Sequence, residues 1–195
     1  MTCALETQLK KEHKTASDSF LKDAEGSVVL LHGVFESSVF DAVKSGNGTE
    51  LFVMEGRPGL ESAQTTCREL LRRKIKPTLI ADNMAGFLFY RNLVKEVWLA
   101  CLPVPRSGTY SARQAGQTVD DQGALCPIGS LIVGVLAKRH NVPVYVYPAS
   151  KESRLMGGQK DIFYFKGIKV APQNVKGYVP LVEWLPKKYI TEIHK

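Results

Sequence analysis

Short apolar runs recur along the chain from residue 27 onward and alternate with stretches of helical periodicity. The runs are continuous rather than alternating, as in strands that are buried on both faces of a sheet. They comprise SVVLL (27–31), ELFVM (around 50–53), PTLIA (77–81), VWLACL (97–102) and PVYVY (143–147).

The segments between these runs predict helices, at 35–44, 60–74, 84–94 and 129–140. Strands that alternate with helices indicate a mostly parallel sheet covered on both faces, and the fold class is therefore α/β. A further short helix is expected around residues 186–194, in a tail punctuated by prolines.

Two segments fall outside this alternation. Residues 1–24 have only sparse apolar positions and predict a polar, amphipathic helical arm ahead of a domain that spans 25–195. Residues 103–122 are polar and contain glycine, so they predict a functional loop or an oligomer contact.

The composition fits one globular domain, since the chain has 195 residues and 44% hydrophobic content. No apolar run approaches the roughly 20 residues of a membrane span, and the N-terminus is charged where a signal peptide would be apolar. We therefore expect a cytoplasmic protein without membrane contact.

The four cysteines are widely spaced, which predicts reduced thiols and no metal site. The net charge of +7 is scattered and accompanied by no recognition motif, so nucleic-acid binding is not expected.

Ligands of open α/β sheets bind outside the carboxyl ends of the strands, so the residues that follow each apolar run are candidates. His32 follows the first run as a general base or as a hydrogen-bonded structural residue. Glu55 and Arg57 follow the second run, and either pair with each other or leave Arg57 for a phosphate. Asp82 and Asn83 follow the third run, as helix-capping residues or as ligand-contacting ones.

The segment PIGS offers a possible anion site, because Gly129 and Ser130 open a predicted helix whose free N–H groups favour negative charge. The same residues could equally be an ordinary helix start. The glycine-rich patterns of dinucleotide and P-loop sites are not present, and no cofactor is expected.

Four motifs occur in an order that resembles one protein family. They are EGRPGLESAQTTCREL, IKPTLIADNMAGF, IGSLIVGVLAKRHNVPVYVYPAS and VAPQNVKGYVPLVEWLPKKYITEI. The chain from residue 27 to 195 is similar to the C-terminal Rossmann-like domain of the family that unites the alpha, beta and delta subunits of translation initiation factor 2B with methylthioribose-1-phosphate isomerase and ribose-1,5-bisphosphate isomerase.

In the isomerases of that family, an aspartate in a TDNMA motif and a cysteine in a motif like LTHCN act as acid and base on a sugar 1-phosphate. The resemblance places Asp82 at the aspartate, and VLLHGVFES places His32 at the histidine and Gly33 at the cysteine. The family's ETRPLLQGAR appears here as EGRPGLESAQ, with Glu61 in place of a glutamine. The asparagine and lysine of NKIGT appear as Cys126 and Pro127.

Three hypotheses follow from these matches. The first is a module that binds a phosphorylated sugar or nucleotide without the standard isomerase mechanism and forms a homodimer through its Rossmann-like domain, as relatives do. The second is an aldose-ketose isomerase of a phosphorylated pentose that uses Asp82 with His32 or Glu61. The third is a non-catalytic subunit or regulatory partner of a larger assembly, in which another chain contributes the family's helical domain.

Overall fold

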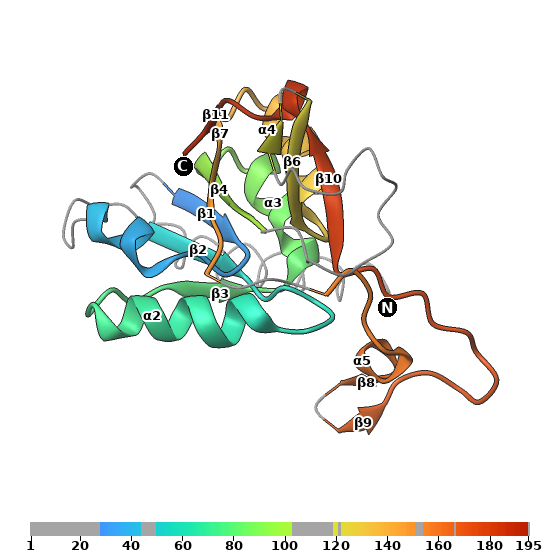
Figure 1. The fold of residues 1–195 in the computed structure, drawn as a ribbon. Coiled ribbons are helices and arrows are strands. Elements are labelled where there is room, and N and C mark those ends of the chain that lie inside the picture. Colours follow the sequence, from blue (N-terminus) through green and yellow to red (C-terminus); the bar gives the residue numbers. More distant parts are fainter. Residues whose placement is uncertain are drawn as a thin grey trace, which may run out of the picture.

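The computed structural model describes residues 28–43, 50–102, 119–120, 122–150, 154–165 and 167–194. The predicted helical arm at 1–24 and most of the predicted loop at 103–122 lie outside these residues. Figure 1 shows the arrangement of the described elements.

The centre of the fold is a six-stranded sheet in which every neighbouring pair of strands is parallel. Across the sheet the order is β11 (Glu192–Ile193), β7 (Val144–Pro148), β4 (Val94–Cys101), β1 (Val28–His32), β2 (Glu50–Met54) and β3 (Thr78–Ile80). The five predicted apolar runs are therefore confirmed as strands. Every residue of β1 is buried, as expected for a central strand covered on both faces.

Helices occupy each of the predicted intervals between the strands. They are η1 (Ser37–Ala42), η2 (Ser62–Thr66) with α2 (Cys67–Arg72), η3 (Asp82–Met84) with α3 (Ala85–Tyr90), and α4 (Ser130–Arg139). Three of them differ from regular α-helix, because η1 and η3 are 3₁₀ helices and η2 is a π-helix. A π segment inside a longer helix is often found at a functional site, and η2 begins beside the cavity described below.

The helices cover both faces of the sheet (Figure 1). One core joins the sheet to α3 and α4 through buried side chains such as Leu88 and Val133. The other core lies on the opposite face and includes Phe40 of η1 and Leu70 of α2. The predicted α/β class with helices on both faces is confirmed.

A small antiparallel sheet was not predicted. It contains β5 (Val119–Asp120), β6 (Gly123–Pro127) and β10 (Val182–Pro186), in the order β10-β6-β5. The predicted helix around 186–194 is wrong, since this segment holds the end of β10, the 3₁₀ helix η4 (Lys187–Tyr189) and β11. This segment is extended because it pairs with other strands. β10 lies against β6, and the Thr191 N–H donates to the Val144 carbonyl at 2.8 Å where the chain joins the edge of the main sheet.

The segment between β7 and β10 leaves the body of the molecule and returns to it. It carries α5 (Gln159–Phe163) and a hairpin of β8 (Tyr164–Phe165) and β9 (Ile168–Lys169), which Figure 1 shows projecting away from the sheet. Backbone bonds between Gly157 and Val179 (2.7 Å) and between Leu181 and Leu155 (3.0 Å) hold its two ends together. No helix in the described part of the chain has the length and hydrophobicity to span a membrane.

Candidate functional site

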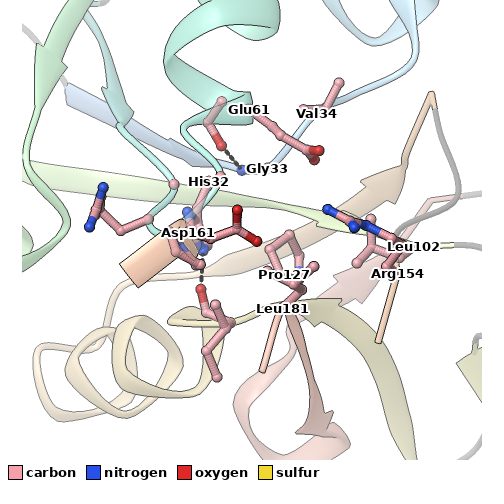
Figure 2. A pocket seen from close by; sticks show the side chains of 15 residues that line it. His32, Gly33, Val34, Glu61, Leu102, Pro127, Arg154, Asp161 and Leu181 are labelled. Atoms are coloured by element: carbon pink, nitrogen blue, oxygen red, sulfur yellow. Dashed lines mark hydrogen bonds between the residues drawn. The ribbon is translucent and has the colours of Figure 1, made fainter. Parts of the chain in front are cut away.

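A cavity of about 220 Å³ lies beyond the carboxyl ends of β1 and β2. Residues 32–34, 56–59 and 61–62 form one side of it, and residues 127–128 at the end of β6 form another. Arg154, Asp161 and Leu181 reach it from the segment between β7 and β10. Figure 2 shows His32, Asp161 and Arg154, from distant parts of the sequence, around the same space. This is the position in which open α/β sheets bind ligands.

His32 borders this cavity but is almost completely buried, with 1% of its surface exposed. Its Nε2 lies 2.8 Å from the Ile128 carbonyl oxygen, and since a carbonyl only accepts, Nε2 carries the proton. Burial lowers the pKa of the imidazole below 6.5, although the Ile128 carbonyl and the charge of Asp82 oppose this shift. The ring is therefore neutral at pH 7, and its other nitrogen, Nδ1, is buried without a hydrogen-bond partner among the described residues.

Gly33 occupies the position at which the resemblance places a cysteine, and its surroundings leave no room for a side chain. Its φ is +112°, and an added Cβ would lie 2.4 Å from the Ala100 Cβ and 3.1 Å from Pro127 Cγ. Two helix side chains fix its peptide groups: the Gly33 N–H donates to Ser62 Oγ at 3.0 Å, and the Thr66 hydroxyl donates to the Gly33 carbonyl at 2.7 Å.

Asp82 connects the end of β3 to the loop that follows β2. Its Oδ1 accepts the Gly56 N–H at 2.9 Å, and its Oδ2 accepts the Arg57 N–H at 2.7 Å. No side-chain capping bond is present at the start of η3 or of α3, so the carboxylate acts across the sheet edge rather than on its own helix. Both carboxylate oxygens thus hold the backbone of the segment that lines the cavity.

Charged side chains of both signs surround the cavity. Arg57 and Arg154 are the cations that line it, and Glu61 and Asp161 are the acids. The Arg57 guanidinium lies 5.0 Å from the ring centroid of Phe165 in the β8–β9 hairpin, a cation–π contact that orients it. Asp161 Oδ2 accepts the Gly158 N–H at 2.8 Å, so this carboxylate also fixes the start of α5.

A carboxylate of the protein accepts a hydrogen bond from the backbone at the start of α4. The Leu131 N–H donates to Glu183 Oε1 at 2.7 Å, and the Ser130 hydroxyl donates to the Pro127 carbonyl at 2.7 Å. Ser130 is fully buried and does not line the cavity. Gly129 lies beside the histidine, because a Cβ added to it would come within 3.3 Å of His32 Nε2. A carboxylate of the protein therefore already occupies part of the predicted anion position.

The structure brings together only some of the residues that the sequence singled out. His32, Arg57 and Glu61 line the cavity, Asp82 supports its wall, and Glu55, Asn83, Gly129 and Ser130 are not among the lining residues. Sequence reasoning missed Ser62, Arg154 and Asp161, and only Asp161 carried a local signal, in the helix-start spacing of Gly158 to Asp161. Burial raises the pKa of Cys126 well above its usual value, so this thiol is protonated and unreactive. No group of His, Cys, Asp and Glu side chains suited to a metal ion occurs among the described residues.

Comparison with known proteins gives a consistent set of relatives. Residues 11–193 match the Initiation factor 2 subunit family. Methylthioribose-1-phosphate isomerase of Acetivibrio thermocellus is 32% identical over 163 residues, 78% of this chain and 44% of the relative. The enzyme of the same name from Trichlorobacter lovleyi is 30% identical over 191 residues, 87% of this chain and 51% of the relative. The chain thus spans about half the length of these relatives.

Solved structures share the fold. Translation initiation factor eIF-2B, subunit delta, from A. fulgidus has a TM-score of 0.69 at 24% identity, over 88% of this chain and 53% of that one. The 5-methylthioribose 1-phosphate isomerase of Pyrococcus horikoshii has a TM-score of 0.65 at 21% identity, over 88% of this chain and 51% of that one.

Proposed function

Because the chain belongs to the initiation factor 2 subunit family, we propose that its cavity binds a small phosphorylated sugar and that it does so without the acid/base pair of the family's isomerases. The isomerase relatives act on a methylthioribose 1-phosphate, according to their name, and the same class of ligand is the natural candidate here. The cavity of about 220 Å³ is smaller than the roughly 300–1,000 Å³ of sites for drug-sized ligands, which favours a sugar phosphate over a nucleotide.

The observation that carries this proposal is the altered state of the two positions that the resemblance assigns to catalysis, Asp82 and Gly33. Both oxygens of Asp82 accept backbone N–H groups, so the aspartate that the resemblance assigns to acid/base catalysis serves here to hold the Arg57 loop. At position 33 the Ala100 methyl occupies the space that a cysteine side chain would need. The arrangement supports binding through the retained residues and argues against the cysteine-dependent reaction.

The anionic end of the ligand is best placed at the arginines. Arg57 and Arg154 both line the cavity, and a guanidinium forms two parallel hydrogen bonds with a phosphate. Two contacts position Arg57 for such binding. Its backbone N–H donates to Asp82, and its guanidinium lies over the ring of Phe165.

Isothermal titration with ribose 1-phosphate, methylthioribose 1-phosphate, adenosine monophosphate and inorganic phosphate tests this proposal. We expect the sugar phosphates to bind, and Arg57→Ala to weaken binding about tenfold or more, since a hydrogen bond to a charged group contributes roughly 1.5–3 kcal/mol. Arg72→Ala is the matched control, because this arginine lies on α2 and pairs only with Glu69 in the described structure. Binding of no sugar phosphate by the wild type would refute the proposal.

Isomerase activity by another acid/base set is the second candidate, and Glu61 is the observation that favours it. Its side chain lines the cavity together with His32, so a carboxylate and an imidazole face the same space. Conversion of an aldose phosphate to a ketose phosphate that disappears in Glu61→Gln would establish this activity, and its absence in the wild type would exclude it.

We further propose a homodimer through the face formed by η3, α3 and α4, in which α3 contacts both other helices. Large apolar side chains are exposed along it: Met84 (53%), Phe87 (49%), Tyr90 (77%), Ile132 (68%) and Val135 (45%). An extended apolar patch of this kind is typical of a protein interface. Sedimentation equilibrium should give a dimer for the wild type and a monomer for Phe87→Glu. Leu71→Glu, at an equally exposed site on α2, should remain dimeric.

The alternative to a homodimer is assembly with a separate helical chain, the partner that the family resemblance led us to expect. A monomer in the sedimentation experiment, together with tight association with a helical protein of the same organism, would favour it over the homodimer.

A further inference from the structure

Two buried polar side chains of the cavity lining are connected through the Gly33 backbone and leave hydrogen-bonding capacity unused. His32 and Ser62 both line the cavity, with 1% and 2% of their surfaces exposed. Ser62 Oγ accepts the N–H of Gly33, the residue that follows His32, so Ser62 contacts the backbone directly after the histidine. Figure 2 shows His32 beside Gly33 and the bond that Gly33 donates.

Each of these side chains lacks one partner. His32 Nε2 donates to the Ile128 carbonyl, which leaves Nδ1 as an acceptor without a donor among the described residues. Ser62 Oγ accepts from Gly33, and its hydroxyl donates no hydrogen bond to another described residue. Buried groups of this kind are normally satisfied, and exceptions call for a physical explanation such as a ligand.

The two unused groups are complementary to one kind of ligand atom. A hydroxyl can donate to Nδ1 and accept from the Ser62 hydroxyl at the same time, whereas a carbonyl or a phosphate dianion only accepts and an ammonium only donates. We propose that His32 and Ser62 together bind one hydroxyl of the sugar, with the phosphate directed to the arginines. This inference rests on the proposed function and identifies the part of the ligand that the cavity recognises beyond its charge.

The proposal gives His32 a role different from that of a base. A neutral imidazole whose Nε2 proton is held by a backbone carbonyl presents a fixed acceptor to the ligand. Because Nδ1 is shielded from solvent, the cavity wall has to yield slightly for the hydroxyl to reach it. Gly129 keeps the Nε2 side of the ring uncrowded, since any side chain there would lie within 3.3 Å of that nitrogen.

Deoxy analogues of the sugar phosphate test this inference. Isothermal titration compares ribose 1-phosphate with its 2-deoxy, 3-deoxy and 5-deoxy analogues on the wild type, Ser62→Ala and His32→Gln. Glutamine is chosen because its amide N–H can replace Nε2 toward Ile128 while no acceptor remains at Nδ1. Thr66→Val is the matched control, because it also removes a side-chain bond to Gly33 but does not line the cavity.

We expect the wild type to lose about fivefold in affinity for one of the three analogues, the effect of a net hydrogen bond. This discrimination should disappear in Ser62→Ala and in His32→Gln and persist in Thr66→Val. Equal discrimination in the wild type and in Ser62→Ala would overturn the inference while the proposed function stands. Absence of any sugar phosphate binding by the wild type would overturn both.

Discussion

Replacement of Gly33 by alanine gives the sharpest test of the argument that this site has no room for a thiol. The added Cβ would lie 2.4 Å from the Ala100 Cβ, far inside van der Waals contact, and neither atom belongs to a flexible side-chain end. Overpacking of this kind costs about 1–3 kcal/mol. The backbone φ of +112° adds a further cost of about 1–3 kcal/mol for a residue with a side chain. Gly33→Ala should therefore lower the free energy of unfolding by about 2–6 kcal/mol.

Two other glycines separate these contributions. Gly167 has a φ of +78° and nothing within 4 Å of an added Cβ, so Gly167→Ala measures the backbone term alone. Gly86 lies in α3 with open space around it, and Gly86→Ala should be neutral or stabilise by up to about 1 kcal/mol. The double variant Gly33→Ala/Ala100→Gly removes the clash and should show a coupling of about 1–3 kcal/mol.

Urea denaturation followed by circular dichroism measures all of these free energies, provided that the slope with urea is unchanged among variants. The reasoning would be refuted if Gly33→Ala cost no more than Gly167→Ala, or if Ala100→Gly failed to relieve it. In either case a thiol at position 33 would be sterically allowed, and the case against the cysteine-dependent reaction would lose its structural basis.

Three further predictions concern the supports of the site. Asp82→Ala should lower the free energy of unfolding by about 2–4 kcal/mol in urea denaturation, because it leaves two part-buried N–H groups without their charged acceptor. Asp82→Asn should lower it less, because the amide keeps one acceptor oxygen. Equal losses in the two variants would contradict this prediction. Burial lowers the pKa of His32 below 6.5, so the unfolded chain takes up the proton first and the free energy of unfolding should fall as the pH drops below about 6.5. His32→Gln should remove this pH-dependent component. An identical pH dependence of urea unfolding in the wild type and in His32→Gln would argue against this prediction. Glu183→Ala should cost about 1–2 kcal/mol in thermal or urea unfolding, since the Leu131 N–H at the start of α4 loses its carboxylate; an unchanged midpoint would show that water replaces it fully.

The strands show which features of the fold were accessible from the sequence. A central strand such as Val28–His32 is apolar at nearly every position because both of its faces are buried, and this continuity is visible in the sequence. The same holds for the helix of Ser130–Arg139, whose predicted interval matches the observed one closely. The helix prediction for the tail at 186–194 was wrong because the conformation of this segment depends on pairing with β6 and β7, which are distant in sequence.

The candidate site divides in the same way. The sequence placed His32, Arg57 and Asp82 at the ends of successive parallel strands, and such strand ends necessarily meet along one edge of the sheet. It carried no sign that Arg154 would reach the same cavity, because the segment that brings it there folds outside the alternation of strands and helices.

What the sequence determined alone is the α/β class, the strands and the edge at which a ligand would be sought, since these follow from hydrophobic continuity and local chain geometry. What only the tertiary structure decided is the state of each side chain at that edge. Asp82 could have capped its own helix, yet its carboxylate holds the loop after β2, and Gly33 could have been a simple flexible turn, yet the Ala100 methyl closes the space beside it. The physical reason is that hydrogen-bond partners and steric neighbours are set by packing between residues 25 to 67 positions apart, which no local pattern records.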